Sequence, residues 1–214
     1  MTNQFQWLNA LSTRPSLEAA VTEVVDRLKQ SLSASVDLGI VFASSAFASD
    51  YPRLIPLILE QFSMPILIGC SGAGIVGMNA EGNAIESEGN IALSLSVASL
   101  PGVEVHPFRI FSKELPDPDS PPGNWIDLMG VDPEQQPHFI LLAEPFSSKI
   151  NELLAGLDFA YPESVKIGGL ASVSSMMAQH SLFYHANNFA EDYLHPDGIV
   201  GVALSGNILV DAIV

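Results

Sequence analysis

The chain has little cysteine, since Cys70 is the only one among 214 residues, and so it cannot form an intramolecular disulfide bond. This usage is typical of a reducing compartment. The amino-terminal residues lack a basic segment and an apolar segment, so no secretory signal is visible. The most apolar window, residues 54–78, is interrupted by prolines, glycines and a glutamate, which is unlike a membrane span. We therefore expect a cytoplasmic protein.

Basic residues are also scarce. The chain has 8 Lys and Arg against 24 Asp and Glu, which gives a formal net charge of −16. Because the basic residues are scattered singly, there is no patch to attract nucleic acid or an anionic membrane surface. Hydrophobic residues make up 48% of the chain, enough for a sizeable core at this length. The composition predicts a globular protein whose partners include neither nucleic acid nor membrane.

Several motifs that carry chemistry are absent. The sequence has no Walker loop and no G-x-S-x-G elbow, and no set of His, Cys, Asp and Glu has metal-ligand spacing. His180 and His185 are five residues apart on a predicted strand, which places them on opposite faces. We therefore expect no cofactor, no metal and no catalytic residue.

Two stretches of the chain, 40–73 and 139–172, resemble each other. Each reads as an apolar strand, a Ser-rich turn, an amphipathic helix and a second strand that ends in Ile-Gly. Phe47 and Phe146 occupy the same place in the two copies. This repeat predicts a duplicated β-α-β unit in a body of pseudo-two-fold symmetry, with a cleft where the strand-end loops meet.

The remaining pattern predicts further elements around these copies. Residues 16–32 have helical spacing with Ser16 as the N-cap, whereas Gly-rich residues 72–83 read as a loop. Alternating apolar residues in 90–100 and 103–110 predict a hairpin that turns at Pro101-Gly102. Strands are also expected near 181–185, over 198–204 and over 208–214, where the last strand would run to the chain end.

The predicted fold is α/β, with internally duplicated β-α-β-β-β units that form mixed sheets with flanking helices. The organisation that we expect is a single domain over 1–214, with copy one at about 37–110, copy two at about 138–214 and a Pro-rich connection at 111–123.

The segment Gly72–Gly77 fits the dinucleotide-binding pattern G-x-G-x-x-G and follows a predicted strand. That pattern binds pyrophosphate only where its last glycine opens a helix. Here the continuation to Asn83 is a poor helix, and Glu86 and Glu88 would repel phosphate. We therefore expect a flexible loop rather than a nucleotide site.

Small polar residues and carboxylates lie at the predicted strand ends, where α/β sheets bind ligands. Glu88 and Glu144 would hold an ammonium group, and backbone amides near Gly72 and Gly168 would hold a carboxylate. A solvated acidic rim is the alternative for the glutamates, and a small buried residue is the alternative to a nucleophile for Cys70. The predicted ligand-binding residues are Ser44, Cys70, Ser71, Gly72, Glu88, Glu144, Ser147, Gly168, Gly169 and Ser172.

A series of motifs together resembles the FIST N domain, the N-terminal half of a module of F-box and intracellular signal transduction proteins. The resemblance covers roughly residues 5–214. The motifs are DLGIVFAS at 37–44, ILIGCSGAGIVG at 66–77, Glu86 and Glu88 before IALSL, LPGVEV at 100–105, ILLAEPFS at 140–147, IGGLAS at 167–172 and GIVGVALSG at 198–206.

The resemblance implies a sensory domain for a small polar ligand, with an amino acid as the favoured guess. It also implies a following FIST C domain, which this chain does not include, and a signalling output protein as partners. Two alternatives stay open: an enzyme that uses Cys70 or a carboxylate on a small substrate, and a protein-interaction scaffold.

Overall fold

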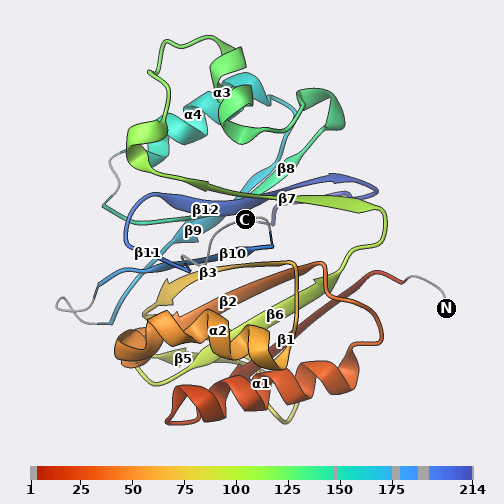
Figure 1. Ribbon diagram of the computed structural model, residues 1–214, viewed down its shortest axis with the longest axis vertical. Coiled ribbons are helices and arrows are strands. Elements are labelled where there is room, and N and C mark those ends of the chain that lie inside the picture. The colour runs from red at the N-terminus through yellow and green to blue at the C-terminus, as the bar shows by residue number, and fades with distance from the viewer. Residues whose placement is uncertain (1–3, 147–148, 175–178, 188–192, 214) are drawn as a thin grey trace. The chain divides into compact units, whose positions relative to one another are not determined.

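The computed structural model describes residues 4–146, 149–174, 179–187 and 193–213 (Figure 1). The chain divides into two compact units. Unit 1 comprises Met1–Pro101 and Ala171–Pro196, and unit 2 comprises Gly102–Leu170 and Asp197–Val214. Both units combine helices with sheets, so the predicted α/β class with mixed sheets is confirmed. No helix in the described ranges is long and apolar enough to cross a membrane.

Unit 1 is built on a six-stranded sheet in which only one pair of neighbours is parallel. Its strands are β1 (Gln6–Ser12), β2 (Leu38–Ser44), β3 (Ile66–Gly72), β6 (Leu93–Ser99), β10 (Leu182–Ala186) and β11 (Leu194–His195). Their order is β1-β6-β2-β3-β10-β11. β2 and β3 run parallel with Ile40 opposite Ile68, and the other neighbours are antiparallel. The carboxyl ends of β2 and β3 are therefore adjacent.

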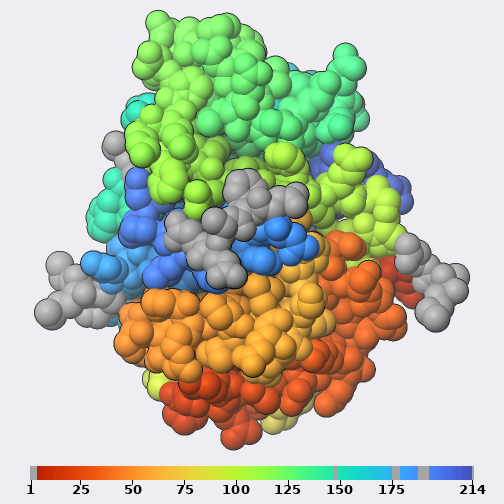
Figure 2. All heavy atoms as spheres, viewed as in Figure 1, coloured from red at the N-terminus to blue at the C-terminus, as the bar shows by residue number. Residues whose placement is uncertain are grey.

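Two helices, α1 (Leu17–Ser31) and α2 (Tyr51–Gln61), lie on one face of this sheet (Figure 1). The hydroxyl of Ser16 accepts a hydrogen bond from the Ala19 N–H at 3.3 Å, so Ser16 is the N-cap that the sequence predicts. The 3-10 turn η1 (Ser45–Asp50) leads from β2 into α2. Figure 2 shows that α1 and α2, in red to orange, form the outer surface of unit 1 on this side. The buried stripe of α1 has the predicted helical spacing and consists of Leu17, Ala20, Val21, Val24, Val25 and Leu28.

A hairpin of β4 (Gly74–Met78) and β5 (Ala84–Glu88) also belongs to unit 1, and it corrects the predicted loop over 72–83. A Cβ on Gly77 would lie 2.7 Å from Asn9 Oδ1 and 2.8 Å from Ser94 Oγ, so the glycine serves close packing rather than flexibility. Arg27 of α1 fixes the hairpin, because its guanidinium donates to the carbonyl oxygens of Leu11 and Met78 at 2.9 and 3.0 Å.

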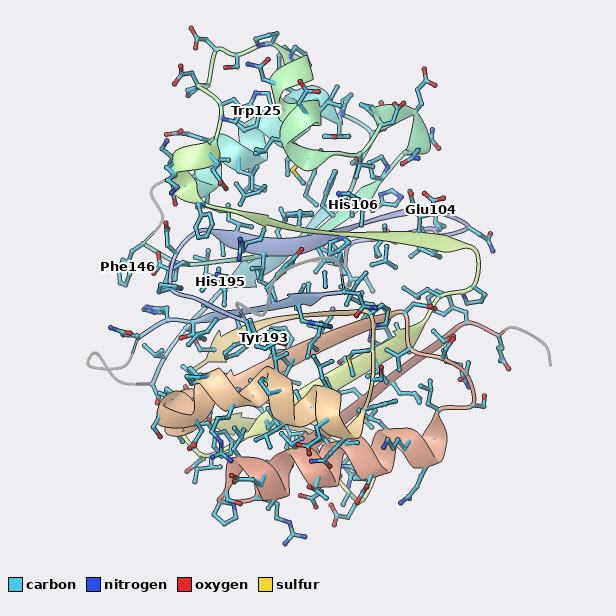
Figure 3. All side chains as sticks on the ribbon, in the orientation of Figure 1. Glu104, His106, Trp125, Phe146, Tyr193 and His195 are labelled. Carbon is cyan, nitrogen blue, oxygen red and sulfur yellow. The ribbon has the colours of Figure 1, made fainter. Side chains whose placement is uncertain are left out.

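Unit 2 contains a four-stranded sheet in the order β7-β12-β8-β9. Its strands are β7 (Val103–Ile110), β8 (His138–Ala143), β9 (Lys166–Leu170) and β12 (Ile199–Gly206), and its helical elements are η2 (Ser112–Glu114), α3 (Pro122–Met129), η3 (Pro133–Gln135) and α4 (Ile150–Ala160). Trp125 of α3 is buried against α4 (Figure 3). A Cβ on Gly156 would lie 2.3 Å from its indole ring, so a glycine lets the two helices approach.

One predicted strand pairing and one predicted strand are wrong. β6 pairs with β1 and β2, whereas β7 pairs with β12, so residues 90–110 do not form a hairpin. The alternating pattern identified both strands correctly, but alternation reports a half-buried strand and not its partner. The second correction is at the carboxyl end, where residues 208–213 do not form a strand.

The two units share a strand order over four strands, β1-β6-β2-β3 in unit 1 and β7-β12-β8-β9 in unit 2. In each, the last two strands are a parallel pair joined by a helix, α2 or α4. This is the β-α-β unit that the sequence predicts twice. An internal duplication of the chain, with the copy boundaries and single domain given above, stays a prediction.

Candidate functional site

Five serines gather where β2 and β3 end in unit 1, and we call them the strand-end serine cluster: Ser44, Ser45, Ser71, Ser172 and Ser174. Ser44 lies opposite Gly72 in the parallel register, so both strands end at the same level. The carboxyl edge of parallel strands is where open α/β sheets bind their ligands. The remaining two serines come from residues 171–174, where the chain returns to unit 1.

Hydrogen bonds tie residues 171–174 to both strand ends. The Ser172 N–H donates to the Ser71 carbonyl at 3.0 Å, and the Ala73 N–H donates to Ser172 Oγ at 2.9 Å. The Ser174 N–H donates to Ser45 Oγ at 3.3 Å, and the two hydroxyl oxygens are 2.6 Å apart. Three segments that are distant in sequence therefore converge on one small polar surface.

The serines of this cluster have two different roles. Ser44 and Ser71 are buried, and each hydroxyl accepts a backbone N–H, from Ala92 at 3.1 Å and from Ser181 at 3.2 Å respectively. These two serines organise the backbone. Ser45 is half-buried, and Ser172 and Ser174 are exposed, so the hydroxyls available to a ligand lie on these three residues. Sequence reasoning did not select Ser45 and Ser174, although the Ser44-Ser45 doublet and the Ser-rich stretch after Ala171 were visible signals.

Cys70 lies inside the sheet of unit 1, between Phe42 of β2 and Leu182 of β10. Its side chain is 3% exposed, and burial raises the pKa of its thiol to about 12. The thiol is therefore protonated at neutral pH, whereas a nucleophilic cysteine needs its thiolate. Burial, and then the neighbouring Cys70, also raise the pKa of the Tyr51 hydroxyl. This environment favours the small buried residue over the nucleophile.

Two further predicted site residues, Gly72 and Glu88, lie at the ends of β3 and β5. A Cβ on Gly72 would lie 2.7 Å from Ile75 Cδ1, so a larger residue at the turn into β4 would displace that side chain. A strand and not a helix follows this turn, so the G-x-G-x-x-G segment does not form a pyrophosphate site. Glu88 is exposed at the end of β5, and the next N–H, of Gly89, donates to the Ala73 carbonyl at 2.9 Å. The backbone that follows Glu88 is thus held at Ala73, the residue that contacts Ser172.

Three predicted site residues lie in unit 2 instead. Glu144 is buried after β8, and its carboxylate accepts the Phe146 N–H at 2.8 Å while its own N–H donates to the Gly198 carbonyl at 3.0 Å. Gly168 packs against β8, because a Cβ there would lie 1.8 Å from the Leu141 carbonyl oxygen.

Gly169 is exposed, and a Cβ there would meet nothing within 4 Å. Ser147 lies outside the described residues. Six of the predicted site residues thus belong to unit 1, namely Ser44, Cys70, Ser71, Gly72, Glu88 and Ser172. A ligand that bridges the two copies, held by Glu88 and Glu144, stays a prediction.

Comparison with known proteins points to one family. A protein-family model described as FIST N domain matches residues 37–214. The comparison with curated proteins finds no match. Within the described part of the chain, no group of three or more His, Cys, Asp and Glu residues could hold a metal ion.

Proposed function

Because the chain belongs to the FIST N domain family, which is associated with sensing in signal transduction, we propose that unit 1 senses a small polar molecule at the strand-end serine cluster. The observation that carries this proposal is the convergence of three chain segments on the carboxyl ends of β2 and β3. Such an edge of parallel strands is the usual ligand position in an open α/β sheet.

The chemistry of the cluster favours an amino-acid-like ligand. Serine hydroxyls both donate and accept hydrogen bonds, so those of Ser45, Ser172 and Ser174 suit a carboxylate or another small polar group. The carboxylate of Glu88, an exposed residue whose backbone pairs with Gly74 next to Ala73, would hold an ammonium group. The buried, protonated thiol of Cys70 does not favour covalent catalysis, the alternative function.

The proposed mechanism is a population shift of residues 171–174. These residues follow directly on the last residue of β9, Leu170, and so form one of the chain connections between the two units. A ligand that binds the hydroxyls of Ser45 and Ser174 changes how firmly this connection is held to β2 and β3. The ligand thereby biases the segment of unit 1 that directly follows β9 in the chain. A FIST C domain or a signalling output protein, the proposed partners, would respond to the change.

Isothermal titration calorimetry of the full chain with the twenty amino acids and a set of small carboxylates tests the proposal. We expect one or a few of these compounds to bind. The ligand that binds, at 100 times its Kd, should raise the free energy of unfolding by about 2.7 kcal/mol. The variants Ser45→Ala and Ser174→Ala should each weaken binding about 3- to 10-fold, which corresponds to the loss of one neutral hydrogen bond.

Ser31→Ala is the matched control, because Ser31 is an exposed serine at the end of α1. It should leave the Kd unchanged. The proposal fails if none of the compounds binds, or if Ser31→Ala weakens binding as much as Ser174→Ala does.

A further inference from the structure

The four-stranded sheet of unit 2 has two edge strands, and they are built differently. An edge strand presents unpaired N–H and C=O groups, and proteins usually protect it with charges or proline. β7 is protected in this way: Pro107 lies within it, and the exposed side chains of Glu104 and His106 project from it (Figure 3).

β9, the other edge, lacks such protection. In the part of the chain that the structure describes, its only strand partner is β8. Residues 167–170 are all exposed, with 37% of Ile167 and 55% of Leu170 accessible to solvent. The one charged residue is Lys166, whose ammonium group donates to the Tyr161 carbonyl at 2.7 Å and lies 2.9 Å from Asp158 Oδ1. That charge is directed to the end of α4, so no charged side chain of β9 itself protects the strand edge.

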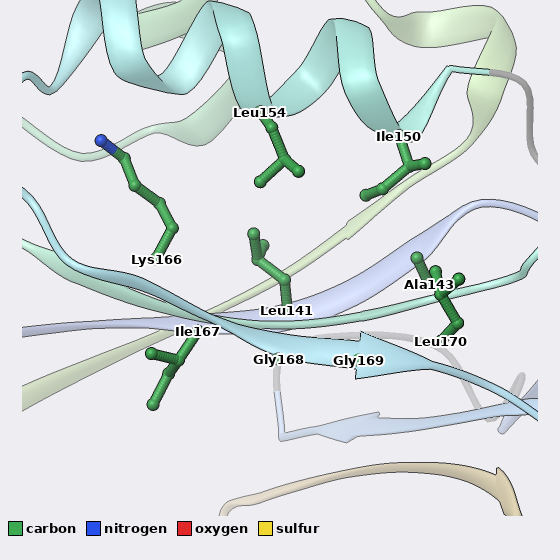
Figure 4. A pocket seen from close by; sticks show the side chains of 9 residues that line it. All are labelled: Leu141, Ala143, Ile150, Leu154, Lys166, Ile167, Gly168, Gly169 and Leu170. Atoms are coloured by element: carbon green, nitrogen blue, oxygen red, sulfur yellow. The ribbon is translucent and has the colours of Figure 1, made fainter. Parts of the chain in front are cut away.

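A small apolar cavity of about 260 Å³ lies between β9, β8 and α4 (Figure 4). Ile150 and Leu154 of α4 cover it, and Lys166 and Leu170 stand at its two ends (Figure 4). The cavity is below the roughly 300–1,000 Å³ of sites for small-molecule ligands. Its size and apolar lining suit a single apolar side chain.

We propose that β9 is the docking edge for an extended segment of a partner protein. The segment adds to the sheet as a further strand beside β9 and places one apolar side chain in the cavity under α4. In strand addition the main-chain hydrogen bonds provide affinity, and pockets for alternate side chains provide specificity.

The charge of the chain indicates what the partner segment carries. A net charge of −16 repels a second copy of the same protein, and it attracts a segment with Lys or Arg at its ends. The occupant is therefore an apolar strand with basic flanks from another protein.

Fluorescence anisotropy with the full chain and labelled seven-residue peptides tests this proposal. Each peptide has Lys at both ends and apolar residues at every second position, and its central residue is Ala, Val, Leu or Phe. We expect the peptides with a larger central residue to bind. Strand addition also predicts an alternating pattern: N-methylation of one set of alternate amides should abolish binding, and N-methylation of the other set should not.

Gly169→Lys is the variant that protects the edge, since a Cβ at this position meets nothing within 4 Å. Gly123→Lys is the matched control, because this exposed glycine of α3 also has open space and the charge change is the same. Gly169→Lys should weaken peptide binding at least tenfold and Gly123→Lys less than twofold. Ala143→Leu, which fills the cavity, should shift the preference toward the peptide with a central Ala.

Circular dichroism on each variant separates a loss of binding from a loss of folding. The proposal is overturned if none of the peptides binds the unmodified chain, or if Gly123→Lys weakens binding as much as Gly169→Lys. It is also overturned if sedimentation shows a dimer that Gly169→Lys dissociates, because a second copy would then occupy the edge.

Discussion

The second strand of the parallel pair is buried in unit 1, where it is β3, and largely exposed in unit 2, where it is β9. β3 lies between β2 and β10, and all of its residues are buried. β9 pairs with β8 along one side, and four of its five residues are exposed. The two strands follow similar helices and share an Ile-Gly pair, so the local pattern does not decide their role. What decides it is whether another strand covers the far edge.

The shared glycine shows what the two strands have in common. A Cβ on Gly69 would lie 2.0 Å from the Val41 carbonyl oxygen, and one on Gly168 would lie 1.8 Å from that of Leu141. Both strands therefore approach their parallel neighbour closely at the same point of the pattern. The next position differs, since Cys70 is enclosed by β10 and Gly169 faces open space.

The largest expected difference between the strands is in thiol reactivity. With a pKa of about 12, Cys70 is roughly 0.01% thiolate at pH 8, against about a quarter for an ordinary thiol. A cysteine introduced by Gly169→Cys in a Cys70→Ala background should react with a disulfide reagent at least about 1,000-fold faster than native Cys70. Absorbance of the released thiolate measures both rates. Rates within tenfold of each other would contradict the enclosed position of Cys70.

Alanine in place of the shared glycine tests the close approach to the parallel neighbour that β3 and β9 have in common. Gly69→Ala and Gly168→Ala should each lower the free energy of unfolding by about 3 kcal/mol, because the added methyl group meets a neighbouring carbonyl. Gly169→Ala should change it by less than about 0.5 kcal/mol, as expected for an exposed position. Urea unfolding followed by circular dichroism gives all three values. A mild effect at Gly168 alone would show that β9 can shift away from β8.

Ser71 in β3 and Leu170 in β9 both lie three positions after the shared isoleucine. Replacing each with alanine should lower the free energy of unfolding by different amounts. Ser71→Ala leaves the buried Ser181 N–H without its side-chain acceptor and should cost about 1–2 kcal/mol. Leu170→Ala, at a position 55% exposed, should cost less than about 0.5 kcal/mol. Equal costs in urea unfolding would mean that β9 is as enclosed as β3.

The smallest expected effect is a difference between the unmodified chain and Cys70→Ala in how their stability depends on alkaline pH. Because burial raises the pKa of Cys70, the protonated thiol stabilises the fold below the ordinary thiol pKa, and this stabilisation is lost as pH rises toward about 12. Between pH 8 and pH 9.5 the unmodified chain should lose about 1 kcal/mol more than Cys70→Ala does. Thermal unfolding of both proteins over this range checks the difference, and parallel curves would contradict it.

Local pattern predicts the elements of this fold well and their neighbours poorly. Helical spacing with Ser16 as the cap predicts α1 nearly to the residue, and alternation predicts β6 and β7. The partners of β6 and β7 were wrong because a period of two is the same in any sheet. The glycines of β4 were read as a loop because close packing, as at Gly77, has no local signature.

Local pattern likewise predicts the strand ends of the candidate site but not the contacts between distant segments. The strand ends at Ser44 and Ser71 follow from the pattern of β2 and β3, and both residues lie in the cluster. The contact between Ser45 and Ser174 joins residues far apart in the sequence, which a single sequence does not reveal. Glu144 stays a predicted ligand-binding residue, and the sequence did not predict that its carboxylate accepts the Phe146 N–H in the turn after β8.

In the proposed function, the ligand binds at the strand-end serine cluster of unit 1. Amide hydrogen exchange of the full chain, with and without the compound that binds in calorimetry, tests it most directly. We predict slower exchange in peptides that cover 43–47, 71–75 and 171–174, and unchanged exchange in β9. Slower exchange confined to unit 2, or none at all when the compound is saturating, would contradict the account.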